Sequence, residues 1–490
     1  MPGRPNGYSR DADPFNPRLP ANVVTAVGIW CEQDKFMGIK VFNTMTREVE
    51  PLTTNKPRRV EFFVCGPTVY DFSHLGHAKT YTQFDFIVKY IRARGYEVVY
   101  AQNITDVDDR IIDRANQRGL SPADLAAEFE KYYIEDMTAL HNDSVNVYAR
   151  AHNYIDQIVD QISRLIEKGY AYRITDGYYF DLTKFPEYGK LSGRSELKPD
   201  DSVARIDENI EKRNPGDFCL WKMRKEGEPF WETPLGAGRP GWHIEDTAIT
   251  EHLFGPQYDI HGGAVDLIFP HHEAEIAQIE AASGLKPMVR HWLHTGFLNM
   301  KSGKMSKSKG NFITIRDLLT TVNYRVVRFF FISHHYRGPM EWSLEYLEQA
   351  RNGLGRINNF VRLIDAQLDD TENETVVAKF REDFYNHLDN DFDTPAAVAL
   401  LFELIREQNK FGSPGVRILN LMQEINTFFD FISFTSGSLE MEIENLIQAR
   451  QELRSQRKFK EADELRDRIL SQGIVLEDTQ QGVRWRYRES

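Results

Sequence analysis

Apolar residues along the chain occur in two patterns, short continuous runs and positions spaced three and four apart. The runs predict buried strands, and the wider spacing predicts helices with one buried face. Early in the chain, strands are predicted at Val60–Val64 and Glu97–Gln102, with a helix between them at Ala78–Arg94 that Gly95 is placed to end. A strand, a helix and a strand within about 45 residues form a βαβ unit, the seed of a parallel sheet.

The same succession returns later in the chain. A strand at Tyr258–His261, a turn at Gly262-Gly263, a helix at Pro270–Ser283 and a strand at His291–Met300 form a second half. Between the halves lies a long mixed segment that contains a predicted hairpin at Tyr170–Thr183. The pattern predicts an α/β fold, in which a doubly wound, parallel-sheet (Rossmann-like) domain is split by an insertion.

From about Glu341 the pattern changes to an α-helical bundle followed by a small C-terminal domain. The predicted helices of the bundle are Leu344–Leu368, Val376–His387, Pro395–Asn409 and Val416–Phe431. A final helix is expected to carry Leu465 and Ile469 on one face and basic residues on the other. These basic residues are Arg450, Arg454, Arg457 and Lys458.

The first 36 residues differ from the rest, because five prolines and several polar residues resist packing. We expect them to form a disordered extension, with the fold starting near Met37. Asp11 and Asp13 precede the apolar stretch Val23–Trp30, which disfavours a signal peptide. The expected segments are an extension (1–36), the first half of the nucleotide-binding domain (37–115), an insertion (116–237), the second half (238–316), a linker (317–345), the bundle (346–435) and the C-terminal domain (436–490).

Composition narrows the classes of protein that remain. The chain has 490 residues, enough for about three domains, with 41% hydrophobic and 12% aromatic residues. No apolar run approaches the ~20 residues that a membrane span needs. The net charge of −13 disfavours a sequence-blind nucleic-acid binder but leaves room for a local basic face. Three cysteines, Cys31, Cys65 and Cys219, predict no disulfide framework and favour a reducing cytoplasm.

The first candidate for chemistry is the tetrapeptide His74-Leu75-Gly76-His77, placed where the first strand leads into the first helix. Helix amides and the helix dipole attract phosphate there, and Gly76 lets a ligand approach the backbone. The two imidazoles could donate to phosphate oxygens as charge builds up in a transition state. Taken alone, they are equally compatible with two ordinary loop histidines.

A second candidate is the loop segment Lys304-Met305-Ser306-Lys307-Ser308, flanked by Gly303 and Gly310. Mobile lysines on such a loop can neutralise a triphosphate while pyrophosphate leaves. A solvated basic loop would be the usual interpretation of this segment alone. The two motifs together, in this order, are far more specific.

His-Leu-Gly-His and Lys-Met-Ser-Lys-Ser resemble the two signatures of class I aminoacyl-tRNA synthetases. Further segments narrow the resemblance to the cysteinyl-tRNA synthetase family, from about Met37 to the C-terminus. These are FVCGPTVYD (63–71), NITDVDD (103–109), RNPGDFCLWK (213–222), GRPGWHIE (238–245), FPHHEAEIAQ (269–278) and GIVLED (473–478).

The resemblance implies that the chain activates L-cysteine with ATP to cysteinyl-adenylate and pyrophosphate, then transfers cysteine to the terminal ribose of tRNA(Cys). It implies that His74, Gly76 and His77 contact ATP and that Lys304 and Lys307 hold the departing phosphates. Mg²⁺ would accompany ATP without a dedicated protein cage. The family also favours a monomer.

A metal site is suggested first by His271 and Glu275, which are four apart on one predicted helix and so share a face. Such a pair is more often a surface pair than a set of ligands. The family resemblance adds Cys65 and implies a Zn²⁺ ion, one per chain. The position of a second family cysteine is occupied by Asp246. Aspartate is an accepted zinc ligand, so we expect the metal to be retained, with an empty site as the alternative.

The resemblance also implies two sets of contact residues. The residues expected to line the amino-acid pocket are Gly66, Thr105, Trp242 and His261, of which Thr105 and Trp242 are equally compatible with core packing. Segment 317–345 would contact the tRNA stem, and the C-terminal domain would bind the anticodon. Candidate tRNA contacts are Arg454, Phe459, Asp463, Asp478 and Trp485.

Two rival functions stay open at this point. One is a cysteine ligase that activates cysteine in the same way but joins it to a small amine acceptor. The other is a non-catalytic RNA-binding paralogue, for which Asp246 is the evidence. The C-terminal segment counts against the first rival, and the two phosphate motifs count against the second.

Overall fold

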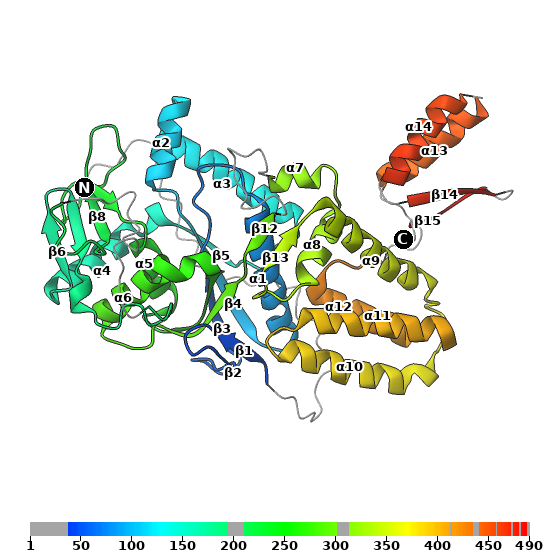
Figure 1. Cartoon of the computed structure of the whole chain (residues 1–490), viewed down its shortest axis with the longest axis horizontal. Helices are drawn as coiled ribbons and strands as arrows, with labels where there is room; N and C mark the ends of the chain where they lie inside the picture. The colour runs from blue at the N-terminus through cyan, green and yellow to red at the C-terminus, as the bar shows by residue number, and fades with distance from the viewer. Residues whose placement is uncertain are drawn as a thin grey trace. The chain divides into compact units, whose positions relative to one another are not determined.

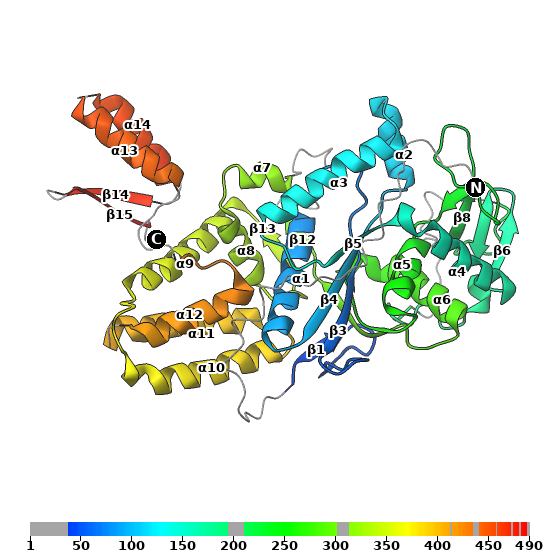
Figure 2. The same cartoon turned by 180° about the vertical axis from the view of Figure 1, so that it is seen from behind.

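The computed structural model of the chain describes residues 38–194, 210–300, 313–411, 414–434, 441–456, 458–471, 474–479 and 482–487. Two compact units are formed, one by Met1–Phe297 with Asp389–Asp391 and the other by Leu298–Leu388 with Phe392–Ser490. Figures 1 and 2 show their elements from two sides. Among the described residues, no helix has the length and apolarity that crossing a membrane requires.

The first unit is built on a five-stranded sheet in which each neighbouring pair is parallel. Its strand order is β11 (Val289–Thr295), β10 (Tyr258–Ala264), β3 (Arg59–Val64), β4 (Glu97–Ile104) and β5 (Val147–Arg150). The chain builds outward from β3 to β5 on one side and from β10 to β11 on the other. The strand order therefore reverses between β3 and β10, and ligands bind at the carboxyl ends of strands at such a point.

Helices and a smaller sheet complete this unit. The helices are α1 (Leu75–Ala93), α2 (Asp109–Arg118), α3 (Pro122–Ala139), α4 (Ile155–Glu167), α5 (Ile244–Phe254) and α6 (Glu273–Ser283). Short helical turns are η1 (Ala151–Tyr154), η2 (Leu182–Lys184), η4 (Val265–Leu267) and η5 (Ile268–His272). A smaller antiparallel sheet contains β6 (Ala171–Ile174), β7 (Gly177–Phe180) and β8 (Cys219–Met223) from the predicted insertion, and β9 (Gly238–Pro240) just after it. A hairpin of β1 (Lys40–Asn43) and β2 (Glu48–Pro51) opens the unit.

The second unit is mostly helical. Its elements are β12 (Leu298–Met300), α7 (Ile315–Leu319), α8 (Tyr324–Ile332), β13 (Met340–Trp342), α9 (Leu344–Leu363), η7 (Thr371–Asn373), α10 (Glu374–Asp389), α11 (Thr394–Phe411), α12 (Val416–Phe429), α13 (Met441–Ser455), α14 (Phe459–Ser471), β14 (Ile474–Thr479) and β15 (Gly482–Tyr487). In both views α10, α11 and α12 lie side by side. The paired strands β14 and β15 form an antiparallel hairpin at the C-terminal end.

The α/β fold split by an insertion, the hairpin predicted at Tyr170–Thr183 (β6 and β7) and the helical bundle are confirmed, and three local predictions are wrong. Gly262 and Gly263 continue strand β10 opposite Leu293 and His294 instead of forming a turn. They are glycines because of close packing: a Cβ on Gly262 would lie 2.6 Å from the ring of Phe84.

The other two differences concern strand and helix ends. The strand predicted at His291–Met300 divides into β11 and β12, and β12 pairs with β13 in the second unit. The final basic helix is two helices, α13 and α14, and Arg450 is buried rather than on a solvated face. Periodicity alone could not reveal these breaks, because both sides of each break keep the same pattern.

Candidate metal centre and nucleotide site

The His-Leu-Gly-His motif forms the start of α1, directly after the turn that follows β3. His74 is the N-cap residue, and its Nδ1 accepts a hydrogen bond from the Gly76 backbone N–H at 3.0 Å. The backbone N–H of His74 in turn donates to Nδ1 of His77 at 3.3 Å. The two imidazoles thus cap the first turn reciprocally, which satisfies amides that a helix end leaves without partners.

This arrangement fixes the protons of both rings. Burial lowers the pKa of His74 and lowers that of His77 well below its ordinary value, so both rings are neutral at pH 7. Because Nδ1 of each ring accepts a hydrogen bond, the single proton of each ring is on Nε2. The rings stack with their centroids 3.9 Å apart. The motif therefore holds two Nε2–H donors on rings whose planes lie within 13° of each other.

The second candidate phosphate motif, which contains Lys304 and Lys307, lies outside the described residues. The nearest described segment before it is β12, which ends at Met300. The roles expected of the two lysines stay predictions.

A buried cluster lies at the reversal point between β3 and β10. Cys65 follows β3, Asp246 belongs to α5, His271 to η5 and Glu275 to α6. Nε2 of His271 lies 3.1 Å from Asp246 Oδ2 and 2.9 Å from Glu275 Oε1, and Cys65 Sγ lies 3.7 Å from the same Glu275 oxygen. One donor atom from each of the four residues lies within 4.8 Å of the others, and we call this set position A.

The electrostatics of position A suit a cation. Burial, with the charges of Glu275 and Asp246, raises the pKa of the Cys65 thiol well above its ordinary value. Burial alone would lower the pKa of His271, but the same two carboxylates raise it to about 10. The protein alone thus holds a proton at the centre of the cluster, where a divalent ion would supply more charge.

The donor set also fits a metal chemically. Asp246 Oδ1 is buried and has no hydrogen-bond partner among the described residues, although a buried carboxylate oxygen normally has one. A thiolate, an imidazole and two carboxylates are all groups that Zn²⁺ accepts as ligands. Nδ1 of His271 lies 2.7 Å from Nδ1 of the neutral His243, a support typical of metal-binding histidines.

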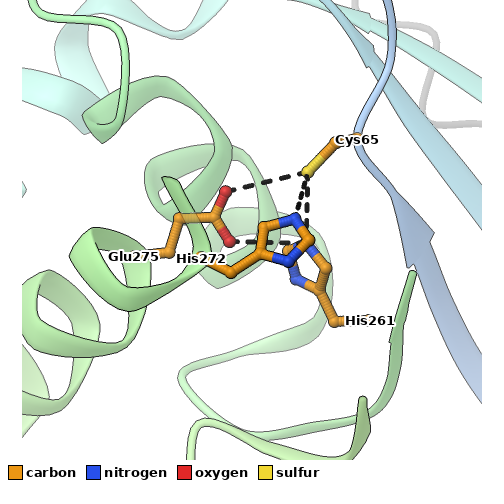
Figure 3. Close-up of side chains that lie close together, drawn as sticks. All are labelled: Cys65, His261, His272 and Glu275. Carbon is orange, nitrogen blue, oxygen red and sulfur yellow. Dashed lines mark hydrogen bonds and ion pairs between the residues drawn. The ribbon is translucent and has the colours of Figure 1, made fainter. Parts of the chain in front are cut away.

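Two further histidines belong to the same cluster, and Figure 3 shows how they point toward Cys65. Nε2 of His261 and Nε2 of His272 each lie 3.2 Å from Cys65 Sγ. Sequence reasoning placed His261 in the amino-acid pocket and missed His272. The adjacent histidines at 271 and 272 were the available signal, but consecutive residues on a regular helix do not share a face.

The other residues expected in the amino-acid pocket lie around position A. The Trp242 ring stacks on His271 with 4.4 Å between centroids, and the backbone N–H of Gly66 donates to Asn103 Oδ1 at 2.5 Å. The Thr105 hydroxyl is buried and donates to the carboxylate of Glu245. Thr105 therefore positions Glu245, next to the cluster residue Asp246.

The predicted tRNA contacts lie on four elements of the C-terminal segment. Arg454 is exposed on α13, Phe459 begins α14 with 58% of its surface exposed, and Asp463 is exposed on α14. Asp478 lies on β14 and Trp485 on β15. The hairpin packs through Ile474 and Leu476 against Ile469, with Leu446, Ile447 and Val483 around them.

Comparison with known proteins shows which families the parts of this chain resemble. A family model for the catalytic domain of class I (C) tRNA synthetases matches residues 51–352, a DALR domain matches 383–431, and a cysteinyl-tRNA ligase anticodon-binding domain matches 436–486. The fold is also similar to methionyl-tRNA synthetase of Mycobacterium tuberculosis, with a TM-score of 0.56 at 16% identity over 76% of this chain and 88% of that one. Together the fold and the site define a class I aminoacyl-tRNA synthetase.

Similar sequences identify the family. The cysteine–tRNA ligase of Thermococcus onnurineus is 43% identical over 476 residues, covering 92% of this chain and 99% of that protein. That of Thermoplasma acidophilum is 43% identical over 455 residues, covering 91% and 100%. The chain belongs to the cysteine–tRNA ligase family.

Proposed function

We propose that this member of the cysteine–tRNA ligase family selects its amino acid through a metal ion at position A and activates it beside the two histidines of α1. Its activity is that of a cysteine–tRNA ligase, with L-cysteine, ATP and tRNA(Cys) as substrates. The observation that carries the proposal is the buried thiol, imidazole and carboxylate set at the carboxyl ends of β3 and β10. The start of α1 follows the same strand β3, so amino acid and ATP can meet at one edge of the sheet.

In the first step, the carboxylate of cysteine attacks the α-phosphate of ATP and pyrophosphate leaves, which yields cysteinyl-adenylate. Negative charge builds up on the α-phosphate oxygens in the transition state. The Nε2–H groups of His74 and His77 are fixed by their backbone hydrogen bonds and donate to these oxygens without reorganisation. We assign Lys304 and Lys307 to the departing pyrophosphate, with Mg²⁺ carried by ATP.

Selection of cysteine is the task of position A. A bound Zn²⁺ ion lowers the pKa of a thiol and prefers it to a serine hydroxyl, a distinction that pocket shape makes only weakly. Cys65, Asp246, His271 and Glu275 would hold the ion, and Trp242 stacked on His271 would keep that ring in place. Asp246 makes the set harder than a second thiolate would, but keeps the same ligand charge.

In the second step, a hydroxyl of the terminal ribose of tRNA(Cys) attacks the carbonyl carbon of the adenylate and AMP leaves. A ligase with a small amine acceptor has no use for the anticodon-binding domain matched at 436–486. A non-catalytic paralogue has no use for a preorganised pair of phosphate donors. We expect a monomer in a reducing cytoplasm, where the thiol of Cys65 stays free to bind metal.

The experiment that tests metal selection combines metal analysis with cysteine-dependent ATP–pyrophosphate exchange. We expect about one tightly bound zinc per chain in the wild type. Asp246→Ala should weaken zinc binding and raise the KM for cysteine, while the KM for ATP changes little. Wild-type protein that holds no metal after mild chelation yet charges tRNA with cysteine would refute the metal role.

A separate experiment addresses the tRNA contacts. Arg454→Glu reverses a charge on the exposed face of α13 and should raise the KM for tRNA by about tenfold, since each phosphate contact contributes mainly electrostatic affinity. ATP–pyrophosphate exchange, which needs no tRNA, should be unchanged. An equal loss in both assays would contradict the assignment of Arg454.

A further inference from the structure

The cluster around Cys65 contains more potential ligands than position A uses. Cys65, His261, His272 and Glu275 bring one donor atom each to within 4.8 Å of one another. All four are buried, with at most 5% of their surface exposed. Figure 3 shows them converging from strand β10, helix α6 and the ends of β3 and η5.

The distances between these atoms match a tetrahedral ion site. Zinc bonds of about 2.0–2.3 Å place neighbouring ligand atoms roughly 3.3–3.8 Å apart. Three distances fit edges of one such tetrahedron: 3.2 Å from Cys65 Sγ to each histidine Nε2, and 3.3 Å from His261 Nε2 to Glu275 Oε2. The other carboxylate oxygen, Glu275 Oε1, lies 3.7 Å from Sγ.

Both histidines are held with Nε2 toward this centre. Nδ1 of His261 lies 2.6 Å from the Tyr258 hydroxyl, and Nδ1 of His272 lies 2.8 Å from Nε2 of His294. Nδ1 of His294 continues the chain to the Thr44 hydroxyl at 2.8 Å. Hydrogen bonds on the far nitrogen are the usual support of a metal-binding histidine, because they fix both the tautomer and the ring orientation.

The backbone of β10 leaves room for one of these rings. A Cβ on Gly263 would lie 2.8 Å from Cε1 of His272 and 3.1 Å from its Nε2. Only glycine at this position lets the imidazole lie against the strand with Nε2 near Cys65.

We propose that Cys65, His261, His272 and Glu275 form a second metal-binding position, B, which takes a borderline divalent ion such as Zn²⁺ or Co²⁺. The inference goes beyond the proposed function, which places the ion at position A. Position B has one thiolate, two imidazoles and one carboxylate, whereas A has one thiolate, one imidazole and two carboxylates. Position B is therefore the softer ligand set, and it should select zinc over harder ions such as Mg²⁺ and Mn²⁺ more strongly than position A does.

Positions A and B share two ligands. Glu275 turns Oε1 toward His271 of position A and Oε2 toward His261 of position B, at 2.9 and 3.3 Å. An ion at B takes Cys65 and Glu275 away from A, which then keeps Asp246 and His271. Position B thus retains a buried ion when the ligands peculiar to A are absent.

The test is a titration of metal-free, full-length protein with Co²⁺ and then Zn²⁺. One double variant, Asp246→Ala with His271→Ala, disables only A, and a matched one, His261→Ala with His272→Ala, disables only B. Thiolate-to-cobalt charge transfer reports binding at Cys65, and circular dichroism checks that each variant is folded. X-ray absorption of the zinc-loaded variants counts imidazole ligands, and the same measurement on the single variant His271→Ala decides the matter if a double variant does not fold.

We expect the A-disabled variant to bind about one ion per chain with two imidazole ligands, and with affinity within about 100-fold of the wild type. Loss of binding in that variant, with binding intact in the B-disabled variant, would overturn position B and leave the proposed function standing. The converse result, binding lost only in the B-disabled variant, would support B and refute A. Zinc-loaded His271→Ala protein with two imidazole ligands also supports B, and zinc bound there without imidazole ligands contradicts it.

Discussion

Two pairs of histidines occupy corresponding places in the two halves of the catalytic unit. His74 and His77 lie at the start of α1 after strand β3, and His271 and His272 end η5, directly before α6 and after strand β10. Strands β3 and β10 are parallel neighbours in the sheet. Both pairs therefore follow the carboxyl ends of strands, where ligands bind in this kind of fold.

The partners of the two pairs differ, and so does their chemistry. His74 and His77 hydrogen-bond to backbone amides, and burial lowers the pKa of both. His271 instead meets two carboxylates, which raise its pKa to about 10 despite burial. The first pair offers N–H donors to an anion, and the second belongs to a cluster that attracts a cation. Neighbouring groups, rather than residue type or place in the sheet, make this difference.

The largest effect should come from removing the ligand shared by A and B. Cys65→Ser is expected to lower zinc affinity and raise the KM for cysteine by more than about 100-fold. The effect should be larger than that of removing a residue that only hydrogen-bonds to a ligand, because a direct ligand is lost. Metal analysis and ATP–pyrophosphate exchange check this. The other described cysteine, Cys219, is buried between Tyr172 and Tyr179, so Cys219→Ser is the matched control and should keep both properties. Unchanged zinc binding in Cys65→Ser would mean that the cluster around His271 and His272 does not bind the cation, and the contrast with His74 and His77 would be lost.

Breaking the first pair alone should affect chemistry and leave the metal in place. His77→Ala removes one fixed donor and is expected to lower kcat for pyrophosphate exchange by about 100-fold. Zinc content should stay at the wild-type level. His387→Ala on α10, where the side chain is 44% exposed, serves as the control and should change neither quantity. Zinc loss in His77→Ala would show that the two pairs are one coupled site.

A smaller effect should come from the support behind position A. Nδ1 of His271 lies 2.7 Å from Nδ1 of His243, so His243→Ala removes the acceptor that orients the His271 ring. Zinc affinity should fall by about tenfold. His243→Asn keeps a side-chain acceptor and should recover part of that loss. Equal affinities for both variants and the wild type would mean that this contact plays no part in metal binding.

The smallest effect concerns a buried cation on α1, two residues beyond His77. Burial lowers the pKa of Lys79 to about 7, and Nζ donates to the Gly296 carbonyl at 2.8 Å. An unfolded lysine has a pKa near 10.4, so between about pH 10 and 7 the unfolded chain binds more protons and falling pH destabilises the folded state. The stability of wild type relative to Lys79→Met should drop by about 1 kcal/mol from pH 9 to pH 8 and level off below pH 7.

Urea denaturation at several pH values checks this prediction. Lys131→Met changes a side chain that is 75% exposed and should show no such trend. A pH-independent difference between Lys79→Met and wild type would mean that Lys79 stays charged in the folded state, as His271 does beside its carboxylates.

Much of the architecture followed from local patterns. The apolar runs that became β3 and β4 and the spacing that became α1 are interpretable because strands and helices bury residues at fixed periods. Helix ends were least certain: α13 ends at Ser455 and α14 begins at Phe459, although the basic and apolar spacing continues across the break. Tertiary packing decides such ends, since both helices bury residues against the β14–β15 hairpin.

The sequence by itself determined the type of fold, indicated two candidate phosphate-binding motifs and, through resemblance, gave the four residues of position A. The tertiary structure decided how those residues are used. Asp246 and Glu275 lie on different helices, and only their convergence on His271 gives that ring a high pKa. His272 could not be placed from the sequence, because η5 departs from a regular helix at Phe269, where φ is −134° and ψ is 128°. Coulombic interactions and metal coordination both depend on distances of a few ångströms between segments that are far apart in the chain. The spacing of residues along the sequence does not specify these distances.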